Sequence, residues 1–213
     1  MKRSNPRLRT GGQMSLWQSS RKDELKYKDQ TTNVLLDTSG ISVINPNLNI
    51  VRGTADTERI GSRITLKSLQ LNGWIRLTAN AALTAINGST MATIYIVLDK
   101  QANGATALFN DVFDSYNGLT LLDMSNRDRF SLLKKMVVPL YATAVDDTAN
   151  VIAGPSKYFT CYQKMNVPIQ YTSANTDGAV SGIQDNNIVV FANIAAADGT
   201  YTMFLQSRIR FQD

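Results

Sequence analysis

The segment Thr200–Phe211, which reads TYTMFLQSRIRF, is the clearest indicator of the fold. Its apolar residues of one parity are Tyr201, Met203, Leu205, Ile209 and Phe211. Side chains of one parity lie on one face of a β-strand, so this pattern is typical of a strand that covers a core with one face. We therefore predict that Arg208 and Arg210, which have the opposite parity, lie together on the outer face of a sheet.

Three more runs have the pattern of strands. Lys157–Tyr171 alternates in the same way, and Pro168 within it favours a strand at the edge of a sheet. Met91–Asp99 is apolar on both parities, as in a strand that is buried on two faces. In Ile64–Ala79 the apolar parity switches after Leu66, which predicts a β-bulge or a bend at that point.

The order of these runs predicts an all-β protein. Two further strands are expected at Arg129–Val138 and Ile188–Ile194, and shorter strands in the loops bring the total to about eight. A short helix is expected only in Ala107–Tyr116. Irregular spacing and long loops favour Greek-key connections over an internal repeat or a meander. We predict a single jelly-roll β-sandwich of two antiparallel sheets over residues 46–213.

Residues 1–45 differ from this body and are predicted to form a flexible, partly disordered basic arm. Residues 1–30 carry eight cations and three anions, and so account for the whole formal net charge of +5. Met1–Ser20 has no sustained apolar period. The candidates for phosphate binding in the arm are Lys2, Arg3, Arg7, Arg9, Arg21 and Lys22. A nuclear-import signal and a solubilising tail are alternative roles for the same residues.

The composition excludes several classes of protein. The chain has no histidine and one cysteine, Cys161, which excludes a disulfide framework, metal sites built on His or Cys, and imidazole catalysis. Cys161 has the apolar parity of its run, so a buried thiol is expected rather than a nucleophile. No apolar run is long enough to cross a bilayer, and no secretory signal is recognisable. We predict that the protein is not an enzyme, needs no cofactor and does not bind a membrane.

Carboxylates form two groupings, Asp146-Asp147 and the set of Asp111, Asp114 and Asp123. Oxygen ligands of this kind bind Ca²⁺, but neither spacing matches a known cation loop, so no metal site is predicted. Asn87-Gly88-Ser89 has the form of a glycosylation sequon. In the absence of a secretory signal we interpret it as a hairpin turn.

Two motifs carry more information than the strand pattern. Residues 52–73 read RGTADTERIGSRITLKSLQLNG, and residues 94–104 read IYIVLDKQANG. Together and in this order they resemble the capsid proteins of circovirus-like viruses, a group with small circular single-stranded DNA genomes that encode a Rep protein. The resemblance covers roughly residues 50–211. It implies that the first motif opens the first strand of the jelly roll.

The charged residues of the motifs have a physical interpretation of their own. Asp56, Glu58, Arg59 and Arg63 either pair with one another or across an interface, or stay solvated. Asp99 and Asn103 are expected to cap the turn that follows their strand.

The resemblance implies a structural role, namely self-assembly of about sixty copies into an icosahedral shell around a single-stranded DNA genome. RNA stays open as an alternative genome. The implied locations are the virion and, during assembly, the host nucleus. Sixty basic arms would bring only about 300 net charges, fewer than the phosphates of most such genomes, so basic side chains of the body are expected to contribute. Arg208 and Arg210 are candidates, with the interior of the shell, a subunit interface and the solvent as alternative surroundings.

Two other functions are weighed against this one. A jelly-roll carbohydrate-binding module would need a cluster of exposed aromatic residues, and the only tryptophans are Trp17 and Trp74. A cupin-like enzyme would need histidine ligands, which the chain lacks. Both alternatives are therefore less well supported than the shell protein.

Overall fold

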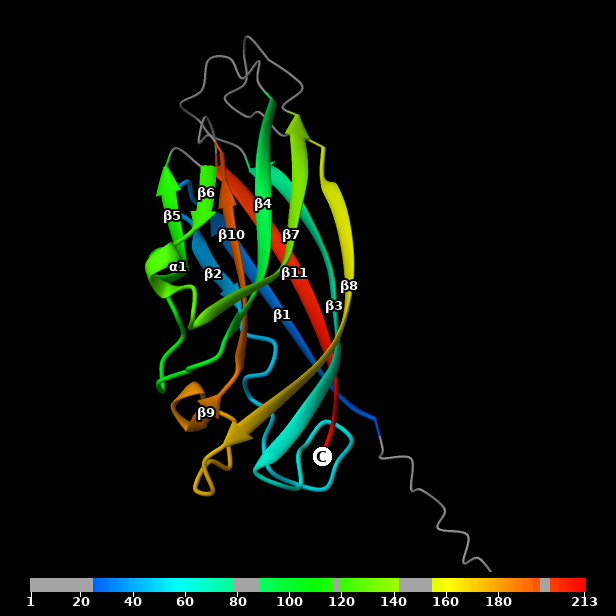
Figure 1. Cartoon of the computed structure of the whole chain (residues 1–213). Coiled ribbons are helices and arrows are strands. Elements are labelled where there is room, and N and C mark those ends of the chain that lie inside the picture. Colours follow the sequence, from blue (N-terminus) through cyan, green and yellow to red (C-terminus); the bar gives the residue numbers. More distant parts are fainter. Residues whose placement is uncertain (1–24, 79–88, 117–118, 142–154, 196–199) are drawn as a thin grey trace, which may run out of the picture.

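Two antiparallel sheets face each other and form the body of the protein (Figure 1). The computed structural model describes residues 25–78, 89–116, 119–141, 155–195 and 200–213. The larger sheet contains, in spatial order, β1 (Lys26–Leu36), β11 (Thr200–Gln212), β3 (Arg63–Thr78), β8 (Lys157–Tyr171) and β9 (Ile183–Asp185). The smaller sheet contains β2 (Ile41–Ile44), β10 (Asn187–Ile194), β4 (Ser89–Asp99) and β7 (Phe130–Tyr141).

The connectivity is that of a jelly roll. β1, β2, β3, β4, β7, β8, β10 and β11 are the eight strands of the sandwich. When these eight strands are numbered 1 to 8 along the chain, those of the larger sheet lie side by side in the order 1-8-3-6. Those of the smaller sheet lie in the order 2-7-4-5. Successive strands therefore alternate between the sheets, except that the fourth and fifth, β4 and β7, are neighbours in the smaller sheet, as in a jelly roll of two Greek keys. The predicted fold class, an all-β jelly-roll sandwich of two antiparallel sheets, is confirmed.

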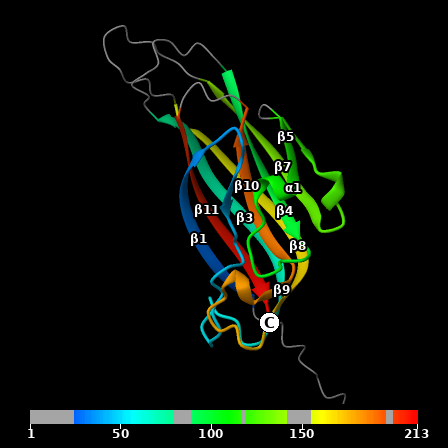
Figure 2. The ribbon, with the colours of Figure 1, turned by 90° about the vertical axis from the view of Figure 1, so that its left-hand side faces the viewer.

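The main core lies between the two sheets (Figure 2). Ile94 and Ile96 of β4 point into it, and both are fully buried. The opposite parity of β4 is buried as well, because Tyr95 and Val97 belong to a second apolar cluster on the outer side of the four-stranded sheet. The prediction that this strand is buried on two faces is confirmed.

An excursion of the chain covers the outer side of the four-stranded sheet. It consists of α1 (Phe109–Val112), β5 (Phe113–Tyr116) and β6 (Leu119–Leu122), followed by the 3-10 turn Met124–Asn126. Phe109 and Phe113 pack there on Tyr95, with ring centroids 6.2 and 4.5 Å away. The helix lies inside the segment that was expected to hold one. In the described part of the chain, no helix is long and apolar enough to span a membrane.

The parity switch in β3 is a β-bulge, as predicted. The pairing of β3 with β8 shifts register between Leu66 and Ser68, and its pairing with β11 shifts between Arg210 and Phe211. The shifts keep both halves of β3 facing the core, since Leu66 and Leu69 are each fully buried. Cys161 of β8 is buried as well, in agreement with the expectation of a buried thiol.

The basic arm is shorter than predicted, because the sandwich begins at Lys26 and not at residue 46. β1 pairs with β11 over its whole length, from Lys26 opposite Phe211 to Leu36 opposite Tyr201. Lys26 itself is buried; its Nζ donates to the backbone oxygen of Glu58 at 2.9 Å and lies 2.9 Å from the Asp213 carboxylate. Lys26 is therefore a structural cation and not part of the arm.

Arg59 of the first motif is buried. Both predicted alternatives for this residue, an exposed ion pair and a solvated loop, are therefore wrong. Its Nε donates to the Ile50 oxygen at 3.1 Å, its Nη1 to the Gly61 oxygen at 2.6 Å, and its Nη2 to the backbone and side-chain oxygens of Asn175. The guanidinium also lies 4.1 Å from the centre of the Tyr171 ring. Burial lowers the pKa of Arg59 from its usual value. This side chain joins two loops that are 116 residues apart in the sequence.

The first motif opens β3, the third strand of the jelly roll, and not the first as the resemblance implied. The second motif ends β4 with an ion pair in which Asp99 is fully buried and Arg129 is partly exposed. Asp99 accepts from Arg129 Nε and Nη2, both at 2.8 Å, and its Oδ1 also accepts from the Gln101 amide at 3.0 Å. Asp99 thus caps the turn as predicted. Asn103 adopts the left-handed backbone conformation in the same turn, with φ of 46°.

Candidate nucleic-acid interface

The outer face of the five-stranded sheet carries the predicted residues Arg208 and Arg210. Both are exposed, while Ile209 between them is fully buried, so the predicted division of β11 into two faces is confirmed. β11 lies between β1 and β3, so both arginines have a neighbouring strand on each side. No excursion comparable to α1, β5 and β6 covers this face among the described residues.

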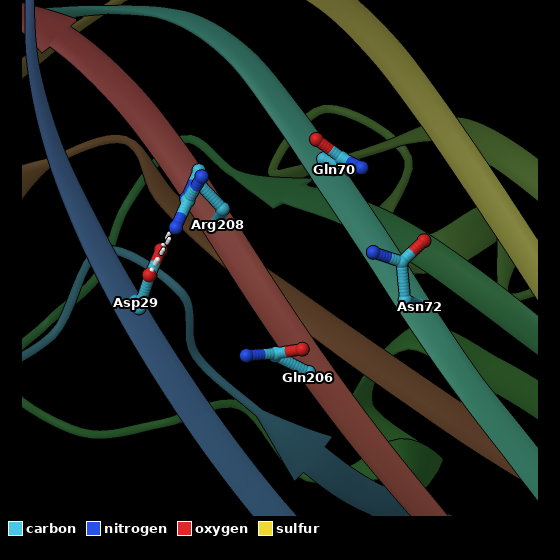
Figure 3. Close-up of a pocket in the computed structure, with 5 residues that line it drawn as sticks. All are labelled: Asp29, Gln70, Asn72, Gln206 and Arg208. Carbon is cyan, nitrogen blue, oxygen red and sulfur yellow. Dashed lines mark hydrogen bonds and ion pairs between the residues drawn. The ribbon is translucent and has the colours of Figure 1, made fainter.

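Arg208 is not a free cation, because it forms an ion pair with Asp29 of β1 (Figure 3). The two residues are directly opposite in the antiparallel register. Arg208 Nε and Nη2 donate to the two carboxylate oxygens of Asp29, each at 2.6 Å. The hydrogen bond from Arg208 lowers the pKa of Asp29, and the same bond raises the pKa of Arg208. Arg208 also lies over the Tyr27 ring, 5.2 Å from its centre.

Basic residues predominate on this outer face. On the outward positions of the five strands, all within the described part of the chain, the acidic residues are Asp29 of β1 and Asp185 of β9. The cations on those positions are Arg63, Lys67, Arg76, Lys164, Arg208 and Arg210. Arg210 has no ion-pair partner among the described residues. A surface with this excess of positive charge attracts polyanions, and its exposed guanidinium and ammonium groups are donors suited to phosphate.

Aromatic rings form a row across the same face. Phe204 of β11 lies opposite Trp74 of β3, which lies opposite Tyr158 of β8. Trp74 and Phe204 are stacked, with ring centroids 5.8 Å apart and planes 14° apart. Tyr158 is 79% exposed. Arg76 lies two positions further along β3, with its guanidinium 5.0 Å from the centre of the Trp74 ring.

Two hollows adjoin this row. One, of about 210 Å³, is lined by the aromatic row together with Asn72, Gly73, Phe159 and Gln206. The other, of about 120 Å³, is lined by Asp29, Gln70, Asn72, Gln206 and Arg208 (Figure 3). The two hollows share Asn72 and Gln206, so rings, side-chain amides and cations follow one another along β3 and β11.

The sequence contains a signal for the aromatic row. Trp74 and Phe204 have the parity of the polar residues in their strands, and an aromatic side chain at such a position lies on the outside of a sheet. Asp29 was missed as part of this site. Its pairing with Arg208 requires β1, which the sequence analysis assigned to the arm.

The other predicted residues fall into two groups. Lys2, Arg3, Arg7, Arg9, Arg21 and Lys22 of the arm lie outside the described residues, as do Asp146, Asp147, Asn87 and Gly88. The arm joins the body at the start of β1, which is an edge strand of the basic sheet. Asp111 and Asp123 cap local turns: Asp111 accepts from the Leu108 amide at 2.8 Å and Asp123 from the Ser125 amide at 2.8 Å. Among the described residues, no group of three or more His, Cys, Asp or Glu is arranged to hold a metal ion.

Comparisons with solved structures give weak similarities to viral proteins. A structure of the Human Polyomavirus 6 VP1 pentamer is 11% identical, with a TM-score of 0.19 and coverage of 90% of this chain and 94% of that chain. A structure of infectious bursal disease virus, Gt strain, is 10% identical, with a TM-score of 0.16 and coverage of 90% and 41%. Both TM-scores are well below 0.5, so neither similarity carries weight for fold or function. No curated protein matches the chain.

A family model gives a match of a different kind. The model described as "Geminivirus coat protein/nuclear export factor BR1 family" matches residues 2–213. The match supports a coat protein of a single-stranded DNA virus, a structural protein and a component of the virion, and does not extend to the narrower circovirus-like resemblance. Because it spans nearly the whole chain, the protein belongs to the geminivirus coat protein/nuclear export factor BR1 family.

Proposed function

We propose that the protein self-assembles into a closed icosahedral shell of about sixty copies and packages a single-stranded genome inside it. Membership of a coat protein family supports the role as a shell subunit. The excess of cations on the outer face of the five-stranded sheet is the observation that carries the packaging role. This face would line the interior of the shell, because the basic arm joins the body at its edge strand β1.

Packaging then depends on phosphate contacts that do not read sequence. The arm supplies one set of cations, and the sheet supplies another, which includes Arg76, Lys164 and Arg210. Counterions released from the nucleic acid provide the favourable free energy of binding. Single-stranded DNA is the proposed genome, with RNA as the alternative. The proposed location is the virion and, during assembly, the host nucleus. Within the single-stranded DNA viruses, a circovirus-like relationship is the narrower proposal.

Electron microscopy of the purified full-length chain tests this proposal. Closed particles of uniform diameter that protect nucleic acid from nuclease are the expected result. Particles without protected nucleic acid would leave the assembly role standing and contradict the packaging role. Monomers or small oligomers under all conditions of salt and pH, with no protected nucleic acid, would contradict the proposal as a whole and favour the carbohydrate-binding alternative.

Deletion of residues 1–24 is expected to leave a folded sandwich, because the deletion ends before the buried Lys26. Affinity for single-stranded DNA should fall. The dependence of log K on log salt should also become shallower, by about 0.7 for each lost phosphate contact. Fluorescence anisotropy at several salt concentrations measures both quantities. An unchanged affinity and salt slope would show that the arm does not contact the phosphates.

Asp29→Asn is expected to strengthen binding of single-stranded DNA, because it releases Arg208 from its ion pair. The salt slope should steepen by about 0.7 if Arg208 gains one phosphate. Asp128→Asn is the control for net charge, since it also removes one acid, which lies beside Arg127 and outside the basic sheet. If both variants bind equally, the effect is one of net charge and Arg208 makes no phosphate contact.

The same ion pair predicts a pH dependence. The pKa of Asp29 is lowered in the folded protein, so its favourable contribution to stability is present above the pKa of the unfolded state. The contribution is lost as the pH falls through the lowered, folded pKa. Protonation of Asp29 should also free Arg208, so the difference in DNA affinity between wild type and Asp29→Asn should shrink over the same acidic range.

A further inference from the structure

We propose that the aromatic row of Phe204, Trp74 and Tyr158 holds unpaired nucleobases by stacking, so that the basic sheet selects single strands over duplex. This inference rests on the proposed packaging function and names the chemistry of its ligand. Phosphate contacts alone would attract duplex and single strands alike. Base–aromatic stacking is open only to bases whose faces are free.

The three rings come from three neighbouring strands and are presented outward together. Phe204, Trp74 and Tyr158 are consecutive partners across β11, β3 and β8. β11 and β3 are paired on both sides, so the backbone beneath the rings is held by ladders of hydrogen bonds. A platform held in this way loses little conformational entropy when a base stacks on it, which favours binding.

The hollow beside the row has the composition of a site for a base. Rings of Trp74, Tyr158 and Phe204 line it, and the side-chain amides of Asn72 and Gln206 lie at its border. Asn72 Oδ1 already accepts from Thr160 Oγ1 at 2.7 Å, which directs its amide donors elsewhere. Amide groups both donate and accept hydrogen bonds, so they can contact the edges of different bases.

Gly73, beside the hollow, makes room for the ring of Phe159. A side chain at this position would place its Cβ 2.5 Å from the backbone oxygen of Phe204 and 2.6 Å from the Phe159 ring. Only glycine therefore fits between the Phe204 backbone and the Phe159 ring, and the ring occupies the space that a side chain would take. The close contact occurs at Gly73 itself, the residue directly before Trp74 in β3.

Cations flank the row on both sides and match the alternation of bases and phosphates along a single strand. Arg76 lies two residues beyond Trp74 on β3, and Arg208 lies four residues beyond Phe204 on β11 in the other direction. Four residues of a strand span about 13 Å. This excess of positive charge favours a polyanion over a second copy of the chain as the partner, since the same face on another subunit is also positive.

The test compares Trp74→Leu with Trp74→Phe in the full-length chain. The Leu variant keeps apolar volume and removes the ring, whereas the Phe variant keeps a ring. For an oligodeoxythymidylate the Leu variant should lose roughly 5- to 150-fold in affinity, the range equivalent to about 1–3 kcal/mol per stacked base. Its salt slope, and its affinity for a duplex of equal length and for inorganic polyphosphate, should not change. The Phe variant should recover much of the loss.

Two controls complete the design. Tyr141→Leu removes an exposed ring from the four-stranded sheet and should have no effect. In a Trp17→Phe background Trp74 is the single tryptophan, so quenching of its fluorescence by the oligonucleotide reports stacking directly. Thermal melting of each variant separates loss of binding from loss of folding.

The outcomes are distinct. Equal losses for single strand, duplex and polyphosphate, or no quenching, would overturn the stacking proposal and leave packaging by phosphate contacts intact. Loss of particles with unchanged oligonucleotide binding would assign the row to a contact between subunits and would also overturn the proposal. If the wild-type chain binds no single strands and protects none in particles, the proposed packaging function itself has failed.

Discussion

Arg59→Met is expected to lower the free energy of unfolding of the subunit by roughly 3–5 kcal/mol. The variant leaves the carbonyl oxygens of Ile50, Gly61 and Asn175 without their donor, and each buried unsatisfied group costs about 1–3 kcal/mol. Replacing a buried ion pair by apolar residues is often neutral, because both charges disappear together. That compensation is absent here, since the partners of Arg59 are oxygens that remain in place.

Urea unfolding of dissociated subunits measures this effect. Arg63→Met is the matched control, since Arg63 is an exposed arginine close by in the sequence and should change stability by no more than about 0.5 kcal/mol. Amide hydrogen exchange should show reduced protection in the two loops that Arg59 joins, around Ile50 and Asn175. Equal stability of the two variants would show that the buried guanidinium contributes nothing to the fold.

Ile96→Ala is expected to cost roughly 2–5 kcal/mol through lost burial and a residual cavity. Ile96 is fully buried in the middle of β4, opposite Val190 of β10, in the core between the sheets. Neighbouring strands on both sides restrict collapse around the cavity, which favours the upper part of the range. Yield of assembled particles should fall because fewer subunits are folded.

The control for this variant is Ile60→Ala, which removes the same atoms from a side chain that is 62% exposed. Its effect should stay within about 0.5 kcal/mol. Thermal melting of both variants measures the difference. A melting temperature of Ile96→Ala that equals that of Ile60→Ala would place β4 outside the core and contradict the fold.

The sequence predicted the strands with a clear apolar pattern and missed β1 and β2, which lie within the segment assigned to the arm. β8 and β11 alternate because one face meets the core, and the expected limits of β8 agree with the observed Lys157–Tyr171. β1 gives no such signal. Its inward positions include Lys26 and Gln30, which bond to backbone oxygens of neighbouring loops, and its outward positions include the apolar Leu35.

The candidate interface was predictable in part. The parity of β11 correctly placed Arg208 and Arg210 on an outer face. The ion pair with Asp29 and the stack of Trp74 on Phe204 depend on the register between strands distant in sequence, which alternation within one strand does not encode. The burial of Arg59 was unpredictable for the same reason, since its partners come from loops that the fold brings together.

The pairing of β1 with β11 has a consequence for biosynthesis. Asp29 and Arg208 are 179 residues apart, so nearly the whole body must leave the ribosome before the five-stranded sheet can close. Contacts of such large sequence separation make folding slow, because the entropy of closing the loop is lost before the contacts form. Nascent chains interrupted before β11 would lack the strand that bridges β1 and β3, and with it Phe204, Arg208 and Arg210. Synthesis of β11 must therefore precede closure of the five-stranded sheet, and a chain that lacks β11 presents no finished surface to a genome.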